Sequence, residues 1–103
     1  MTTPEGKVKA KVKGVISEFG GRIDGYWPVP AGFGESHLDW VGCVNGKFLC
    51  IETKKPGGKP TPRQLGRIRA VRAAGGIAIT IDGTASTTTY EELRSLLTHL
   101  CGP

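Results

Sequence analysis

Residues 38–53, LDWVGCVNGKFLCIET, contain the signal that organises the rest of the chain. Two apolar runs, Leu38–Val44 and Lys47–Thr53, flank the pair Asn45-Gly46. An Asn-Gly pair between such runs is the strongest short-range signal for a β-hairpin, because a type I′ turn requires positive φ at both central residues. The segment therefore predicts two antiparallel strands joined by a two-residue turn.

The turn also predicts which side chains face each other across the hairpin. Counting outward from the residues that flank the turn places Asp39 directly opposite Glu52 and His37 opposite Lys54. Opposed Cβ atoms lie roughly 4.5–5.5 Å apart, so two carboxylates there destabilise the sheet unless a positive charge lies between them. The register therefore predicts a close acid pair that needs a cation.

A divalent metal ion is the natural cation for this pair. Mg²⁺ prefers hard oxygen ligands, commonly one or two carboxylates with water and phosphate oxygens. Lys54 shares a strand face with Glu52, because side chains alternate along a strand, so its ammonium can reach the same phosphate or attacking water. A metal ion and a lysine together provide what phosphodiester hydrolysis requires. The alternative is that Asp39, Glu52 and Lys54 form a solvated salt-bridge cluster on an exposed strand face.

From the length of the chain and the order of its elements we predict one domain over residues 1–103, with a mixed β-sheet flanked by helices. Capping signals at Thr3, Thr61 and Thr89 each open a helix. A crossover helix between two strands predicts that these strands are parallel. The first predicted elements are a helix from Thr3 that Gly20-Gly21 ends and three strands over Arg22–Val29, Leu38–Val44 and Lys47–Thr53. A helix from Thr61 to about Ala74 follows and packs Leu65, Ile68 and Val71. The last two elements are a strand over Ile77–Ile81 that is buried on both faces and a helix from Thr89 with Leu93, Leu96, Leu97 and Leu100 on one side.

Composition limits the classes of function. The 14 Lys and Arg residues exceed the 9 Asp and Glu residues, which gives a net charge of +5 and favours anionic partners such as nucleic acid. The sequence shows neither a signal peptide nor a long apolar run, so we expect a cytoplasmic protein without a membrane segment. Cys43, Cys50 and Cys101 form no CxxC pair, which argues against structural zinc and predicts buried, reduced thiols.

The run Gly34–Asp82, GESHLDWVGCVNGKFLCIETKKPGGKPTPRQLGRIRAVRAAGGIAITID, resembles the VRR-NUC family of the PD-(D/E)XK nuclease superfamily. The similarity is greatest to its small stand-alone members from phages and bacteria. It rests on Asp39, the Glu-x-Lys at positions 52 and 54, the Pro-Thr-Pro-Arg-Gln run at 60–64 and the Gly-Gly before an apolar strand, all in order and at family-like spacing. The resemblance implies a restriction-endonuclease-like α/β fold with an αβββαβ core.

The resemblance also implies roles for individual residues. Asp39 and Glu52 would bind Mg²⁺ or Mn²⁺, with the Thr53 backbone carbonyl as a further ligand. Lys54 would orient the attacking water or stabilise developing charge. Gln64, which matches the family's motif glutamine, would face the site.

Three further positions have weaker or unusual matches. Glu5 matches a glutamate of the family's first helix and would reach the metal through water. His37 stands where relatives usually have proline or a small residue, so it either touches a phosphate or is structural or merely exposed. Thr53 replaces a commoner apolar residue, and strand alternation predicts that its side chain points away from the acids with little effect.

Positive charge gathers beside the predicted site at Lys55, Lys59, Arg63 and Arg67. Contacts to the DNA backbone require such a concentration, although a solvated helix face has the same composition. Tyr26 and Trp27 would either stack on an exposed base or belong to the core or to a subunit interface.

The resemblance implies a structure-selective endonuclease that acts on branched DNA such as a Holliday junction, or on duplex DNA, in a bacterial or phage-infected cell. Cutting two strands of a branched duplex requires two active sites, so a homodimer is expected. One alternative is a non-catalytic DNA-binding module of nuclease fold. Another is a nuclease subunit that is active only with a helicase or another replication or recombination partner.

Overall fold

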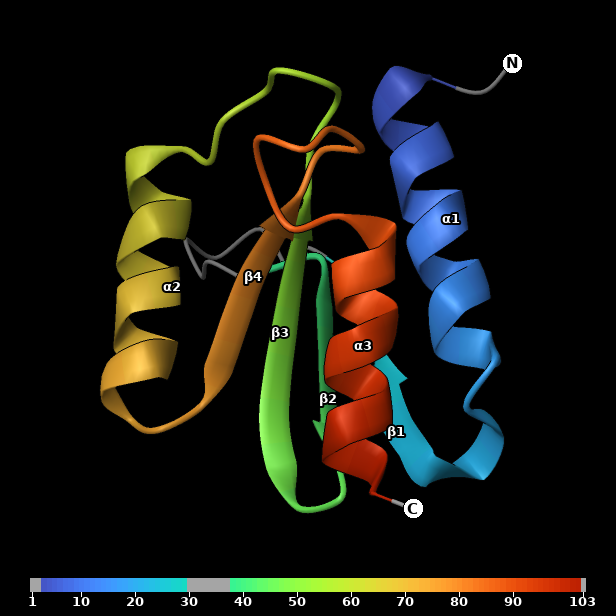
Figure 1. The fold of residues 1–103 in the computed structure, drawn as a ribbon. Coiled ribbons are helices and arrows are strands. Elements are labelled where there is room, and N and C mark those ends of the chain that lie inside the picture. The colour runs from blue at the N-terminus through green and yellow to red at the C-terminus, as the bar shows by residue number, and fades with distance from the viewer. Residues whose placement is uncertain (1–2, 30–37, 103) are drawn as a thin grey trace.

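A four-stranded mixed sheet forms the centre of the molecule in the computed structural model, which describes residues 3–29 and 38–102 (Figure 1). The strand order is β1-β2-β3-β4, with β3 and β4 parallel and the other neighbours antiparallel. The elements are α1 (Pro4–Ser17), the 3₁₀ helix η1 (Gly20–Arg22), β1 (Ile23–Tyr26), β2 (Trp40–Val44), β3 (Lys47–Thr53), α2 (Pro62–Ala73), β4 (Ile77–Ile81) and α3 (Tyr90–Cys101). The predicted α/β class and the αβββαβ order are confirmed.

The hairpin formed by β2 and β3 has the register that its turn predicts. Asn45 and Gly46 both have positive φ, 50° and 81°, as a type I′ turn requires. The two residues that flank the turn pair with each other, and pairing continues outward to Trp40 and Ile51. The parallel pairing of β3 with β4 is also as predicted.

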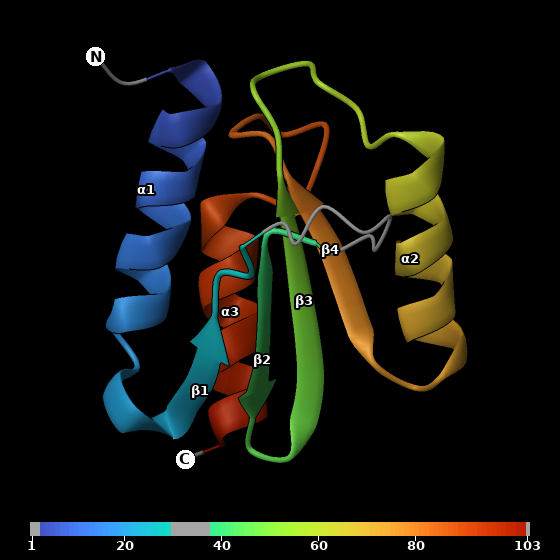
Figure 2. The ribbon, with the colours of Figure 1, turned by 180° about the vertical axis from the view of Figure 1, so that it is seen from behind.

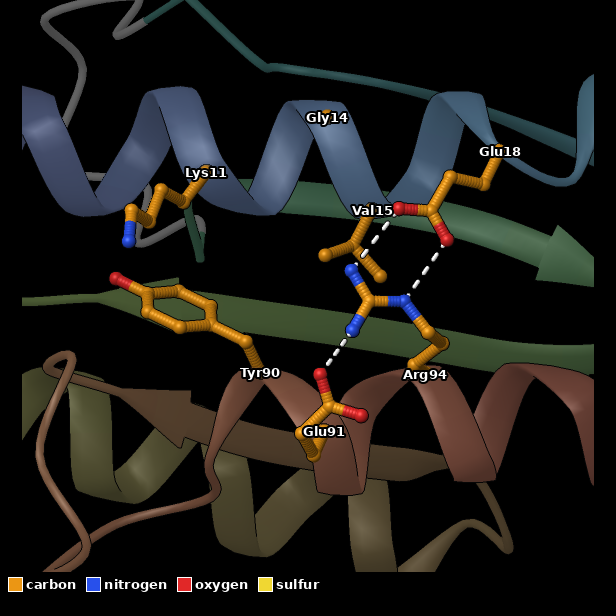
Figure 3. Close-up of a pocket in the computed structure, with 7 residues that line it drawn as sticks. All are labelled: Lys11, Gly14, Val15, Glu18, Tyr90, Glu91 and Arg94. Atoms are coloured by element: carbon orange, nitrogen blue, oxygen red, sulfur yellow. Dashed lines mark hydrogen bonds and ion pairs between the residues drawn. The ribbon is translucent and has the colours of Figure 1, made fainter.

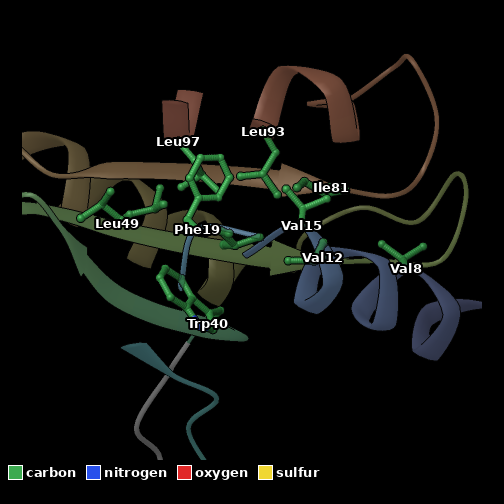
Figure 4. Packing of buried hydrophobic residues seen from close by; sticks show 11 residues of the cluster. Val8, Val12, Val15, Phe19, Trp40, Leu49, Ile81, Leu93 and Leu97 are labelled. Atoms are coloured by element: carbon green, nitrogen blue, oxygen red, sulfur yellow. The ribbon is translucent and has the colours of Figure 1, made fainter. Parts of the chain in front are cut away.

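Helices cover both faces of the sheet (Figures 1 and 2). The helices α1 and α3 pack together on one face, over a core to which β3 contributes Leu49 and Ile51 (Figure 4). On the opposite face α2 packs Ile68 and Val71 against Cys50. Because side chains alternate along β3, Glu52 lies on the α2 face together with Cys50.

In the described residues, each of the α-helices α1, α2 and α3 begins with a side-chain cap. Thr3 accepts a hydrogen bond from the Gly6 N–H at 2.9 Å. Thr61 and Thr89 form complete capping boxes, as predicted. Within residues 3–29 and 38–102, no helix is both long and apolar enough to cross a membrane.

Two predicted element boundaries are wrong. The helix α1 ends at Ser17 instead of Gly20-Gly21, and the chain then turns so that Phe19 joins the core. Strand β1 ends at Tyr26 instead of Val29. Pro28 has no backbone N–H to donate to a neighbouring strand, which is consistent with this early end.

Two buried positions were also predicted wrongly. Cys43 is exposed, because it lies on β2 whereas the α2 helix covers β3 and β4. Cys50 is buried and Cys101 is half-buried. All three thiols are free. Leu65 was expected to pack under α2 but is 37% exposed, in contrast to Ile68 on the same helix.

Two glycines make room for a buried indole. Trp40 is only 2% exposed, and its ring lies against the backbone of β1 and β2. A Cβ atom at Gly25 would lie 2.2 Å from Trp40 Cζ2, and one at Gly42 would lie 2.2 Å from Trp40 Cη2. No real Cβ contact is that short, so any larger residue at either position displaces the indole.

We therefore expect Gly42→Ala to lower the free energy of unfolding by roughly 1–3 kcal/mol, the usual range for an overpacked core. Urea unfolding followed by circular dichroism measures the effect. The control is Gly14→Ala in α1, where a Cβ meets nothing within 4 Å. This control should be neutral or stabilise the protein by up to about 1 kcal/mol. Equal stability of Gly42→Ala and wild type would contradict the packing argument.

Candidate active site

The predicted acid pair lies where β2 begins and β3 ends. The Asp39 N–H donates a hydrogen bond to Glu52 Oε1 at 3.2 Å, and the Thr53 N–H donates to Asp39 Oδ2 at 2.7 Å. Side-chain acceptors thus replace the main-chain ladder at this end, so β2 begins at Trp40 instead of Leu38. The structure brings Asp39 and Glu52 together, as the hairpin register predicts.

Thr53 contacts the acid pair directly, and the prediction that its side chain points away from the acids is wrong. Its hydroxyl donates a second hydrogen bond to Asp39 Oδ2, also at 2.7 Å. The alternation rule fails here because Asp39 lies in a bend outside β2, where the strand no longer directs its side chain. Two donors from one buried residue therefore fix the orientation of the Asp39 carboxylate.

Glu52 is an ionisable group at a buried position, with 1% of its surface exposed. Burial, followed by the charge and hydrogen bonding of Asp39, raises the pKa of Glu52 from 4.5 to about 7, although Lys54 opposes the shift. A solvated cluster on an exposed strand face does not describe this carboxylate. The site therefore holds a glutamate whose negative charge is poorly stabilised by its surroundings.

Two lysines face the acids from different elements. Lys54 Nζ lies 3.4 Å from Glu52 Oε2, and Lys9 Nζ, from α1, lies 3.9 Å from Asp39 Oδ1. Each carboxylate thus has one oxygen bonded to backbone or hydroxyl donors and the other oxygen turned towards an ammonium. Lys9 was not predicted, because only the packing of α1 against the sheet brings it to the site.

The chemistry of the donors fits a hard divalent cation. Asp39 Oδ1 and Glu52 Oε2 are carboxylate oxygens, and Mg²⁺ is usually held by one or two such groups with water completing its coordination. In the described parts of the chain, no group of three or more His, Cys, Asp and Glu side chains could hold a metal ion. Asp39 and Glu52 would supply two carboxylate ligands to such an ion, and the Thr53 carbonyl and water would supply others.

The remaining predicted site residues lie outside this cluster or have other partners. Gln64 Oε1 accepts a hydrogen bond from the Thr61 N–H at 2.9 Å, so its side chain caps α2. Glu5 is half-buried in the first turn of α1. His37 lies outside the described residues. The functional roles of these three residues stay predictions.

The predicted DNA-binding cations are all exposed. Lys55 and Lys59 lie on the loop between β3 and α2, and Arg63 lies in the first turn of α2. Arg67 lies further along α2, beside Phe48 in a pocket of about 250 Å³. Three of the four cations thus gather on the segment that leaves the acid site.

Asp82 is a buried carboxylate that the sequence analysis did not single out. Its Oδ2 accepts a hydrogen bond from the Gly57 N–H at 3.1 Å, and its Oδ1 accepts bonds from the Thr84 N–H and from the hydroxyls of Thr84 and Thr87. The Thr84 hydroxyl contributes most to lowering the pKa of Asp82, from 3.8 to about 2, and the other donors reinforce it. Asp82 therefore ties the loop after β3 to the loop after β4. The sequence signal that could have identified Asp82 is its position directly after the apolar strand Ile77–Ile81.

A pocket of about 440 Å³ adjoins this tied loop. Its wall includes Gly58, Lys59 and Thr80, and Thr80 is the sheet partner of Glu52. Ammonium, hydroxyl and backbone N–H groups are the usual donors to phosphate oxygens. The Lys59 ammonium is such a donor, one strand away from Glu52, whereas the Gly58 N–H is already bonded to the Lys55 carbonyl oxygen at 2.8 Å and the Asp82 carboxylate also lines the pocket.

The sequence matches no protein-family model, and no curated protein is significantly similar to it.

The buried acid predicts how stability depends on pH in the metal-free protein. The folded-state pKa of Glu52, about 7, exceeds its ordinary value of 4.5, so between these values the folded protein binds more protons than the unfolded chain. Ionised Glu52 therefore destabilises the fold increasingly as pH rises through this range, by roughly 3 kcal/mol once the pH exceeds the folded-state pKa. In EDTA, Glu52→Gln should be more stable than wild type at pH 8 by up to this amount, and the difference should shrink towards pH 4.5.

Thermal unfolding of both proteins across this pH range measures the difference. Glu91→Gln is the matched control, because Glu91 is an exposed carboxylate on α3. Its stability relative to wild type should change little with pH. A Glu52→Gln variant with no stability gain at pH 8 contradicts the raised pKa.

Proposed function

We propose that the protein is a metal-dependent endonuclease that hydrolyses DNA phosphodiester bonds. The observation that carries the proposal is the buried Glu52, held against Asp39 at the end of a strand, with Lys54 Nζ 3.4 Å from its carboxylate. Perturbed ionisable groups of this kind concentrate at functional sites. The resemblance of Asp39, Glu52 and Lys54 to the VRR-NUC motif supports the same chemistry.

The residues of the site have different roles in the proposed reaction. Asp39, oriented by both donors of Thr53, presents a fixed carboxylate oxygen, and Glu52 presents a second one beside it. A Mg²⁺ or Mn²⁺ ion held by these oxygens and the Thr53 carbonyl would supply Lewis-acid charge and a water of lowered pKa. Lys54 donates to a phosphate oxygen and stabilises the negative charge that develops there.

The cationic side chains around the site bind the DNA substrate. Lys55, Lys59 and Arg63 contact the phosphate backbone, with Arg67 further along the same helix. Backbone contacts carry no base sequence, so recognition depends on DNA shape and charge. We propose a branched substrate such as a Holliday junction, cut by a homodimer because two strands need two active sites. The resemblance to small phage and bacterial members of the VRR-NUC family supports the cytoplasm of a bacterial or phage-infected cell as the location of the enzyme.

One observation favours a non-catalytic DNA-binding module instead. Asp39 faces Lys9 and Glu52 faces Lys54, so each acid already has a cationic neighbour without a metal ion. This alternative predicts DNA binding that survives in EDTA and no cleavage under any metal. A subunit that requires a helicase or recombination partner would cut only after that partner is added.

Cleavage assays separate these functions. Labelled four-way junction, flap and linear duplex DNA are incubated with Mg²⁺, Mn²⁺ or EDTA. Wild type should cut in a metal-dependent manner, and Glu52→Gln should lower the rate at least about 100-fold, because it removes a charged group from the reacting site. The matched control Glu91→Gln should cut at the wild-type rate.

The ratio of junction to duplex cleavage measures structure selectivity. DNA binding by the wild-type protein without cleavage under any metal rejects the catalytic proposal for the isolated chain. Cleavage that is unchanged in Glu52→Gln rejects the assignment of the site.

A further inference from the structure

The helix α1 carries lysines on both sides of its buried stripe. Val8, Val12 and Val15 face the core, and lysines occupy every second position from 7 to 13. Residues four apart share a helix face, so these lysines form two pairs, Lys7 with Lys11 and Lys9 with Lys13. Two pairs of equal charge therefore flank one stripe.

The Lys7–Lys11 pair faces α3, where acidic groups already lie. Lys11 Nζ lies 5.3 Å from the ring centroid of Tyr90. The same groove, of about 380 Å³, contains Glu18 and Glu91, both bound to Arg94 (Figure 3). These carboxylates lower the attraction of this side of α1 for a polyanion.

The Lys9–Lys13 pair meets on one aromatic ring. The two ammoniums lie 5.7 Å and 5.2 Å from the ring centroid of Trp27. Trp27 packs against the core beside β1, so the ring is a fixed platform. A cation held over an indole is favourable, whereas two like charges on one ring repel each other. The arrangement therefore gathers positive charge at one position, where the ion pair recorded within residues 3–29 and 38–102 is that of Lys9 with Asp39.

This pair adjoins the acid site. Lys9 Nζ lies 3.9 Å from Asp39 Oδ1, and Lys13 lies one helical turn further along α1. Residues four apart are separated by about 6 Å along a helix axis. Phosphates of one DNA strand advance by roughly 3.4 Å per nucleotide along the duplex axis, and because the backbone also winds around that axis, the distance between successive phosphates is longer and comparable to this separation.

We propose that Lys9 and Lys13, positioned by Trp27, bind successive phosphates of the DNA strand on the α1 side of the acid site. The inference rests on the proposed function and extends it, because the cations named above lie on the α2 side. The strand is then held on both sides of the scissile bond. Trp27 acts as a positioning residue for the two ammoniums.

Matched charge variants test the inference. The double variant Lys9→Gln/Lys13→Gln and the control Lys7→Gln/Lys11→Gln each remove two positive charges from the same helix. Binding to labelled junction and duplex DNA is measured in EDTA by fluorescence anisotropy, between about 50 and 200 mM salt. The test variant should bind at least about tenfold more weakly, and its log–log salt slope should fall by roughly 1–2 units. The control should lose less than about threefold, with its slope unchanged.

Single variants remove the influence of the acid pair. Lys9 also faces Asp39, so Lys13→Gln is compared with Lys11→Gln. Lys13→Gln should lower the salt slope by about one unit and Lys11→Gln should not. Equal losses of DNA affinity in the two double variants, or equal changes of the salt slope in the two single variants, overturn the inference. The proposed function then still holds if the wild-type protein binds and cuts DNA. If wild type neither binds nor cuts DNA, both proposals fail together.

Discussion

Positive φ at Asn45 and Gly46 confines the β2–β3 hairpin to one register, and the acid pair depends on that register. A slip by one residue would turn every side chain of β3 to the other face of the sheet. Glu52 would then point into the apolar core under α1 and α3, and Leu49 and Ile51 would leave it. Packing and turn geometry thus enforce the same pairing. The position of Glu52 beside Asp39 follows from both.

The acid pair lowers the stability of the fold locally, and the rest of the structure offsets this loss. Two carboxylates lie together, one of them fully buried, and the shifted pKa of Glu52 reports that its charge is unfavourable there. The buried apolar residues on both faces of the sheet contribute the stability that permits this arrangement. Local violations of packing and charge rules tend to occur at functional sites. The neighbouring lysines lessen the cost without removing it.

The sequence predicted those features that depend on neighbours along the chain. The turn at Asn45-Gly46 and the caps at Thr61 and Thr89 are local patterns with a fixed physical cause, and simple counting from the turn identified Asp39 and Glu52 as neighbours. The bend at Asp39 could not be counted in this way, so the prediction for Thr53 was wrong.

Contacts between distant segments were beyond such patterns. Lys9 reaches Asp39 only because α1 packs against the sheet, and Asp82 reaches Gly57 only because β4 lies beside β3. Nothing in the alternation of β1 and β2 revealed that glycines make room for Trp40. Gln64 was predicted both to cap α2 and to face the site, and the structure establishes only the cap.

The most direct test of the account is whether a divalent cation binds at the acid pair. Nuclear magnetic resonance spectra of ¹⁵N-labelled protein, recorded with substoichiometric Mn²⁺, locate even a weakly bound ion through paramagnetic broadening of nearby amide signals. The account predicts selective broadening at Asp39, Glu52 and Thr53 that is lost in Glu52→Gln. Broadening elsewhere, or equal broadening in the variant, would contradict it.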